Sequence, residues 1–258
     1  MNKLISVPII RWVAFGLFVF TLLMNYLSQG ILFEGKTIGT VSDKYSTLIT
    51  PAGYAFAIWG LIYLMVGAYI YYQTFQAEPE EPFYDRIAFP LILNFIANSG
   101  WLVIFQLEQI ALSSILMVTI LVTLIQVVIL WTNDHSLPEK QRLLMRIPFS
   151  IYLGWISVAT IVNFSLMAKY TGWDVPGVSE SNWVVIMTSV GAALAIMVLF
   201  ATRNLVYPLV FVWAYVAIAV AQPDNQLIFT AALGWAAIIL ISDLVCFILW
   251  RKSKQALA

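Results

Sequence analysis

The hydrophobic residues of this chain fall into long, nearly unbroken runs, which polar residues, prolines or glycines separate. A helix that crosses a bilayer needs roughly 20 mostly apolar residues. Continuous runs favour helices over the alternating strands of a membrane barrel. The pattern therefore predicts eight spanning helices, at about 8 to 27, 51 to 75, 86 to 107, 110 to 132, 145 to 168, 183 to 202, 205 to 221 and 227 to 250.

Two of the predicted breaks are very short. The residues from Gln106 to Gln109 separate the third and fourth spans, and Arg203 and Asn204 separate the sixth and seventh. Glu108, in the first of these turns, is expected to face water. The longest connection, 28 to 50, carries three glycines and no expected helix, and loops of that length often form functional lids.

Composition supports a membrane protein and excludes other classes. Hydrophobic residues make up 62% of the 258 positions and charged residues 10%, whereas soluble domains carry about 25% charged residues. Zero net charge without a basic run argues against nucleic acid as a partner. We therefore expect an all-α integral membrane protein surrounded by lipid.

The positive charges predict the orientation, because Lys and Arg concentrate in short cytoplasmic loops. With eight spans, ten of the thirteen fall on one side and three on the other. The first set is Lys3, Arg11, Arg86, Lys140, Arg142, Arg146, Arg203, Arg251, Lys252 and Lys254; the second is Lys36, Lys44 and Lys169. Both termini are predicted to be cytoplasmic, in the plasma membrane.

Aromatic and amide residues recur at helical spacing in three of the spans, so that each set shares one helix face. The three sets are Phe56, Trp59, Tyr63 and Gly67; Asn94, Asn98, Trp101 and Phe105; and Tyr152, Trp155, Ala159 and Asn163. Such faces can enclose a ligand pocket. They can equally serve helix packing, since amides and hydroxyls often form hydrogen bonds between membrane helices.

Five further tryptophans lie near the ends of spans, where the amphipathic indole prefers the headgroup region of the bilayer. They are Trp12, Trp131, Trp173, Trp183 and Trp250. We interpret them as an interfacial belt.

The same residues resemble motifs of the TspO/MBR family, which includes the tryptophan-rich sensory proteins and the mitochondrial translocator protein. The similar segments are Pro51, Gly53, Tyr54, Phe56, Trp59 and Tyr63; Asn98, Ser99, Gly100, Trp101 and Phe105; and Tyr152, Trp155, Ser157, Ala159, Thr160 and Asn163. The resemblance covers about residues 8 to 168. It suggests a TspO-like bundle in 1–170 and a C-terminal transmembrane extension in 171–258.

The resemblance implies a five-helix bundle whose cavity binds planar hydrophobic molecules, such as porphyrins and sterols, beneath the loop between the first two helices. Flat aromatic side chains can stack on a ring system while amides orient its polar edge. The implied ligand-binding residues are Tyr54, Phe56, Trp59, Tyr63, Asn94, Asn98, Trp101, Phe105, Tyr152, Trp155 and Asn163. No cofactor is required, a tetrapyrrole is a candidate ligand, and a homodimer is left open.

Catalytic and metal-binding chemistry is sparse. His135 is the single histidine, so the sequence has no histidine cluster for zinc or for a catalytic base. The acidic turn from Glu78 to Asp85 is interpreted as solvated. Asp243 falls inside the eighth span, where a charge costs about 2.5 to 3.5 kcal/mol on insertion scales. It serves either in a structural pair, for example with Arg203, or in ion coupling.

Three functions follow. The first is a receptor or carrier that binds a planar hydrophobic ligand without turnover. The second is an ion- or proton-coupled secondary transporter that uses Asp243. The third, an enzyme that degrades porphyrins, is disfavoured because the sequence offers no evident acid, base or metal site.

Overall fold

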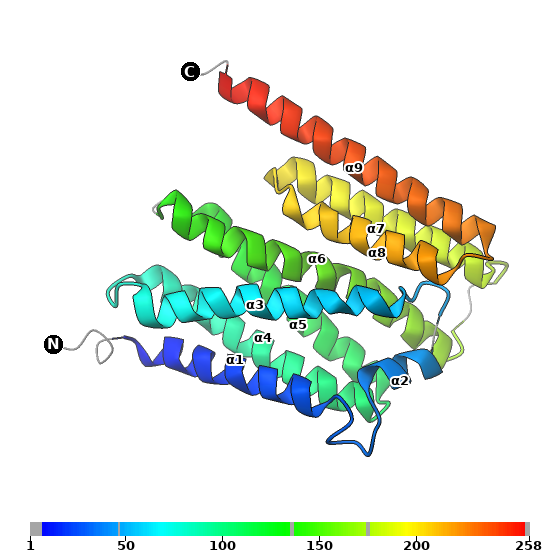
Figure 1. Cartoon of the computed structure of the whole chain (residues 1–258), viewed down its shortest axis with the longest axis horizontal. Coiled ribbons are helices and arrows are strands. Elements are labelled where there is room, and N and C mark those ends of the chain that lie inside the picture. Colours follow the sequence, from blue (N-terminus) through cyan, green and yellow to red (C-terminus); the bar gives the residue numbers. More distant parts are fainter. Residues whose placement is uncertain (1–6, 46, 135–136, 174–175, 256–258) are drawn as a thin grey trace. The chain divides into compact units, whose positions relative to one another are not determined.

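The computed structural model describes residues 7–45, 47–134, 137–173 and 176–255, and within these ranges the chain is helical without strands. Figure 1 shows the helices α1 (Ile9–Leu27), α2 (Ile38–Lys44), α3 (Ile58–Tyr71), α4 (Pro82–Gln106), α5 (Ile110–Asn133), α6 (Glu139–Tyr170), α7 (Glu180–Thr202), α8 (Val206–Ala221) and α9 (Gln226–Gln255). A short 3₁₀ helix, η2 (Gly53–Ala57), precedes α3, and a π-helical turn, η3 (Tyr72–Gln76), follows it.

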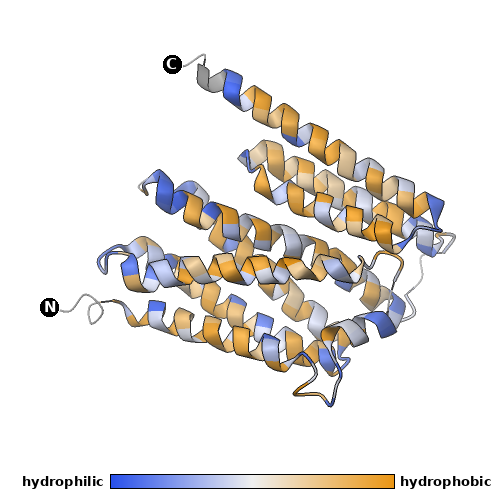
Figure 2. Cartoon of the chain, viewed as in Figure 1, coloured by the Kyte–Doolittle hydropathy of each residue, from blue (hydrophilic) through white to orange (hydrophobic). Residues whose placement is uncertain are grey.

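The eight predicted apolar helices are all present, with ends that differ by a few residues. Seven of the described helices are long and apolar enough to cross a bilayer. The eighth, α8, has 16 residues, so at 1.5 Å per residue it is about 24 Å long, shorter than the roughly 30 Å hydrocarbon core. Hydrophobic residues line the middle of the helices and hydrophilic ones gather at their ends (Figure 2).

Both short breaks between spans are confirmed. Glu108 lies between α4 and α5 with φ of 58°, and Arg203 follows α7 with φ of 52°. Both values are in the left-handed region, which residues other than glycine rarely adopt. A residue in this conformation ends a right-handed helix. A continuous helix through either position is therefore excluded.

The described residues form two compact units, which we treat separately. The first takes the described residues of 1–45 and 59–153, and the second those of 46–58 and 154–258. The division falls within α3 and within α6, next to Gly154. It differs from the division at residue 170 that the resemblance suggested, and that domain assignment stays a prediction.

In the first unit, α4 packs against α1, α2 and α5. In the second unit, α7, α8 and α9 pack against one another, and α8 runs antiparallel to the other two (Figure 1). Small residues permit close packing here. A Cβ atom on Gly154 of α6 would lie 3.0 Å from the carbonyl oxygen of Tyr207 and 2.9 Å from Cβ of Val210, both in α8.

The sequence suggested that the acidic turn after η3 is simply solvated, but the structure gives it a partner. It surrounds Arg11 of α1, whose side chain is fully buried. Arg11 donates to the Asp85 carboxylate at 2.6 Å and to the backbone carbonyls of Glu78 at 3.0 Å and Glu81 at 2.6 Å. Its guanidinium also lies 5.4 Å from the ring centre of Tyr84. The turn therefore binds the buried guanidinium of Arg11.

The connection from 28 to 50 does contain a helix, contrary to expectation. In α2, the Thr37 and Thr40 side chains each accept a hydrogen bond from the other's backbone N–H, a capping box. Gln106 of α4 holds the preceding segment, since its Nε2 donates to the carbonyls of Ser28 at 2.7 Å and Lys36 at 2.8 Å. Residues 28 to 45 of this connection are therefore held within the first unit.

Glu108 organises this loop instead of merely facing water. Its carboxylate pairs with Lys36 at 2.7 Å and also accepts hydrogen bonds from Lys44 and Tyr45. Hydrogen bonding from Lys36, Lys44 and Tyr45 lowers the pKa of Glu108 from 4.5 to about 2. The bond to Glu108 in turn raises the pKa of Lys44.

We expect the order of this loop to depend on pH through Glu108. Because its folded pKa is depressed, its stabilising contribution is present above about pH 4.5 and is lost as the pH falls toward about 2. Hydrogen exchange across pH should show constant protection of residues 28 to 45 down to about pH 5 and a decline below it. Glu108→Gln should remove that decline, whereas Glu34→Gln, an exposed change in the same loop, should retain it. An unchanged decline in Glu108→Gln would contradict the assignment.

Candidate functional site

A buried hydrogen-bond network joins several of the predicted site residues in the first unit. Tyr152 Oη donates to Asn94 Oδ1 at 2.9 Å, and Asn98 Nδ2 donates to Tyr152 Oη at 2.8 Å. Asn94 Nδ2 continues the network to Thr123 Oγ1 of α5 at 2.9 Å. All three predicted residues are at least 98% buried. The structure therefore brings Asn94, Asn98 and Tyr152 together, as their helical faces suggested.

The network extends to α3 and α1. Tyr63 Oη donates to Asn98 Oδ1 over a long 3.5 Å, and Asn25 Nδ2 donates to Tyr63 Oη at 2.6 Å. Hydrogen bonds thus connect α1, α3, α4, α5 and α6. Each interhelical bond of this kind contributes about 0.6 to 2 kcal/mol in a membrane. The side-chain amides of Asn94 and Asn98 thus have hydrogen-bond partners within the chain, which favours the helix-packing interpretation for both.

The predicted aromatic side chains of the first unit form two stacks. Trp59 stacks on Tyr63 with ring centres 5.2 Å apart and contacts Tyr152 edge to face at 5.7 Å. Trp101 stacks on Phe105 at 4.9 Å. The indole Nε1 of Trp101 is buried and has no hydrogen-bond partner in the described part of the chain. A donor in an apolar interior is unfavourable without an acceptor.

The other predicted residues lie in the second unit. Phe56 contacts Trp155 edge to face, with ring centres 5.7 Å apart, and Tyr54 contacts Trp213 at 5.3 Å. Trp155 Nε1 is also buried without a partner among the described residues. Asn163 is 96% buried. The eleven predicted residues therefore form two groups, one in each compact unit.

Asp243 of α9 lies in the second unit. Its Oδ1 atom is buried and has no hydrogen-bond partner among the described residues. The role of Asp243, in a structural pair or in ion coupling, stays a prediction. No group of three or more His, Cys, Asp or Glu residues that could hold a metal occurs within the described ranges. His135 lies outside them.

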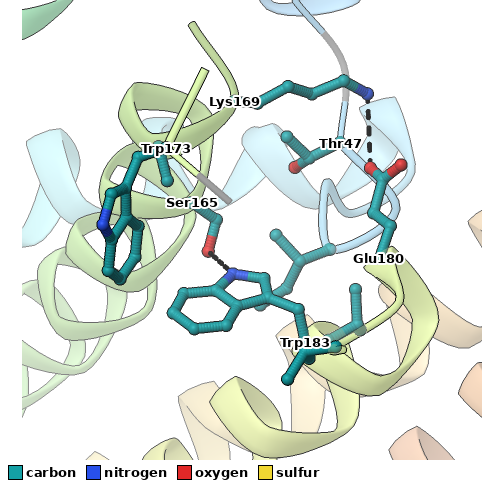
Figure 3. Close-up of a pocket in the computed structure, with 10 residues that line it drawn as sticks. Thr47, Ser165, Lys169, Trp173, Glu180 and Trp183 are labelled. Carbon is teal, nitrogen blue, oxygen red and sulfur yellow. Dashed lines mark hydrogen bonds and ion pairs between the residues drawn. The ribbon is translucent and has the colours of Figure 1, made fainter. Parts of the chain in front are cut away.

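A small cavity opens in the second unit where the ends of α6 and α7 meet the segment before η2 (Figure 3). Its volume is about 140 Å³. Two indoles border it, Trp173 and Trp183, with ring centres 5.8 Å apart and planes at 84°. The remaining lining residues are Thr47, Ile49, Ser165, Ala168, Lys169, Val178, Glu180 and Val184.

Polar contacts hold the walls of this cavity in place. Trp183 Nε1 donates to Ser165 Oγ at 3.2 Å, and Lys169 pairs with Glu180 at 3.2 Å (Figure 3). The Glu180 carboxylate also accepts a hydrogen bond from the backbone N–H of Leu48 at 3.1 Å. A cavity of about 150 Å³ can hold benzene, whereas drug-sized ligands occupy roughly 300 to 1,000 Å³. This cavity accommodates one aromatic ring and not a whole tetrapyrrole.

This cavity was not predicted from the sequence, because Trp173 and Trp183 were interpreted as residues of an interfacial belt. Both lie near helix ends, as belt residues do, but their rings also meet edge to face although ten residues separate them. The available signal was the spacing of Ser165 and Lys169, which lie four residues apart on one face of α6 shortly before Trp173.

Comparison with known proteins gives a family and nothing closer. A family model described as TSPO-like protein matches residues 11–245. A search of curated proteins found no match, and a search of solved structures found none either.

The family match extends further than the resemblance noted from the motifs, which covered about residues 8 to 168. It includes α7, α8 and most of α9 as well as the motif-bearing helices, so more than half of the chain is matched. The three C-terminal helices therefore lie within the matched region. With its all-helical fold and long apolar helices, this chain is a multi-pass membrane protein that belongs to the TSPO-like protein family.

Proposed function

We propose that the protein is a membrane receptor or carrier that binds a planar hydrophobic ligand of the tetrapyrrole or sterol-like class. The observation that carries this proposal is a buried indole N–H group in each unit, on Trp101 in the first and on Trp155 in the second, that has no acceptor among the described residues. Each indole is a separate candidate contact within its own unit. Each N–H group belongs to an indole in contact with another aromatic ring. Membership of the family and the aromatic stacks of the first unit support the same function.

The two indoles offer the chemistry that such a ligand requires. Their ring faces are apolar and can contact a planar ring system. Their N–H groups can donate to a carboxylate, hydroxyl or carbonyl oxygen at its edge, and a few such polar groups fix the orientation of a ligand in an otherwise apolar site. A bound oxygen acceptor would remove the cost of burying each donor.

Porphyrin titration of the purified protein tests this function through quenching of tryptophan fluorescence. Trp101→Ala and Trp155→Ala should each weaken binding about 5- to 150-fold, because each removes a ring contact. Trp101→Phe retains a ring and removes only the N–H, so we expect a smaller loss of about fivefold.

Trp235→Phe is the matched control, since the Trp235 N–H already donates to Ser189 Oγ at 3.0 Å. It should leave porphyrin affinity unchanged. Equal affinity of the wild type, both alanine variants and the control would mean that porphyrin adsorbs nonspecifically, and the proposed ligand class would be withdrawn.

A secondary transporter is the second candidate function, and one observation favours it. The buried Oδ1 of Asp243 has no hydrogen-bond partner among the described residues, and ionisable residues within membrane helices often mark pathways for protons or ions. For a receptor, Asp243→Asn should leave porphyrin affinity within about twofold and should change mainly the unfolding temperature.

Proteoliposomes with an imposed proton gradient separate these two functions. A receptor should show no gradient-driven porphyrin uptake in the wild type or in Asp243→Asn. Uptake by the wild type that Asp243→Asn abolishes, without loss of folding, would favour the transporter. Asp224→Asn, which removes an exposed carboxylate between α8 and α9, is the control. The porphyrin-degrading enzyme has no specific observation in its favour.

We further propose that the protein lies in the plasma membrane with both termini in the cytoplasm. The ten-to-three distribution of Lys and Arg supports this orientation. Lipids as partners and a homodimer remain predictions of the same kind.

A further inference from the structure

A second cavity, of about 370 Å³, lies in the first unit between the end of α5 and the start of α6. Its volume is within the range that small-molecule ligands occupy. It is lined by Trp131, Leu137, Glu139, Arg142, Leu143 and Arg146. None of these residues belongs to the predicted ligand site or to the cavity around Trp173 and Trp183.

Two cationic side chains line this cavity together. Arg142 and Arg146 are one turn apart on α6, so they share a helix face. Like charges at this spacing repel each other and destabilise a helix. Glu139 also lines the cavity. Both guanidinium groups would attract an anion in the cavity.

Trp131 adds a neutral donor to the lining of this cavity. It is 95% buried, and its Nε1 atom has no hydrogen-bond partner in the described part of the chain. Two guanidinium groups and this indole N–H therefore border one cavity as donors. Guanidinium forks match the oxygens of a phosphate group, to which they bind through paired hydrogen bonds.

The apolar residues of the cavity favour a lipid over a free ion. Leu143 is 45% exposed beside the arginines, and Leu137 is buried. The cavity lies at the end of two membrane helices, where the phosphates of lipid headgroups are found. Basic pockets between membrane helices at the cytoplasmic side recognise anionic headgroups, and the charge distribution predicts that this end is cytoplasmic.

We propose that this cavity binds the phosphate headgroup of an anionic phospholipid. Arg142 and Arg146 bind the phosphate oxygens, Trp131 donates through its N–H, and Leu143 contacts the glycerol or the beginning of an acyl chain. This site is independent of the proposed planar ligand, so either proposal can fail without the other.

Titration of the full-length protein in a neutral detergent tests the site. The probes are short-chain phosphatidylglycerol, phosphatidylcholine with the same acyl chains, and inorganic phosphate. Phosphatidylglycerol should bind at least about tenfold more tightly than either of the others. Arg142→Gln should reduce its affinity by about tenfold or more, and Arg142→Lys by less, because a lysine retains the charge without the fork.

Lys140→Gln is the matched control, since Lys140 is an exposed cation on the same helix that does not line the cavity. It should leave the affinity unchanged. Trp131→Phe should weaken binding about fivefold, which provides a second test if an arginine variant fails to fold.

Three results would overturn the proposal. Equal affinity for the two phospholipids would exclude recognition of the anionic headgroup. If inorganic phosphate bound as tightly as phosphatidylglycerol, the cavity would be a site for a free anion instead. An equal loss in Lys140→Gln and Arg142→Gln would mean that binding follows the general surface charge.

Discussion

Arg11→Gln should lower the free energy of unfolding by about 3 to 5 kcal/mol, the range for removing one partner of a buried ion pair. The fully buried guanidinium donates to the Asp85 carboxylate and to three backbone carbonyls of the acidic turn. Glutamine is too short and has too few donors to replace it, so these acceptors would lose their partner. Thermal or SDS-induced unfolding in detergent measures the change.

Arg86→Gln provides the matched control for this prediction. Arg86 pairs with Asp134 at 2.9 Å, but its side chain is 57% exposed. Exposed ion pairs contribute about 0 to 1 kcal/mol, so this variant should unfold close to the wild type. Equal destabilisation by the two substitutions would show that Arg11 contributes no more than a surface charge.

Gly154→Ala should destabilise the second unit by about 1 to 3 kcal/mol, the usual cost of overpacking. The added Cβ would meet the carbonyl oxygen of Tyr207 at 3.0 Å and Cβ of Val210 at 2.9 Å. One of these is backbone, so the contact can be relieved only by moving α6 and α8 apart. Small residues allow such close approach of membrane helices, whose packing supplies much of their association energy.

Gly234→Ala tests whether the effect comes from helix packing. A Cβ on Gly234, within α9, would meet no heavy atom within 4 Å. Alanine is the better helix former by about 1 kcal/mol, so this variant should be as stable as the wild type or more so. If both glycine variants lost the same stability, the close approach at Gly154 would not be the cause.

The apolar runs were sufficient to predict the helices because a membrane helix satisfies all of its backbone hydrogen bonds within itself. Even the breaks at Glu108 and Arg203 could be located, although each rests on only a few polar residues. The sequence did not predict α2, since a seven-residue helix with a local capping box has no long apolar run to reveal it.

The predicted site could be inferred from the sequence only in part. Helical spacing correctly placed Asn94 and Asn98 on one face, but spacing cannot identify the partner of an amide. Tyr152, more than 50 residues away in the chain, supplies that partner. The indole N–H groups of Trp101 and Trp155 have no hydrogen-bond partner among the described residues. Only the contacts with Tyr152 showed that the two amides form hydrogen bonds between helices.

The sequence by itself determined that this chain is an all-helical membrane protein and where its apolar helices run, because both properties depend on local composition and period. The tertiary structure alone decided how its charges and indoles are used. Arg11 meets Asp85 across 74 positions, Glu108 meets Lys36 across 72, and Trp183 meets Ser165 on another helix. Such pairings depend on helix packing in space, which brings together side chains that no local pattern relates.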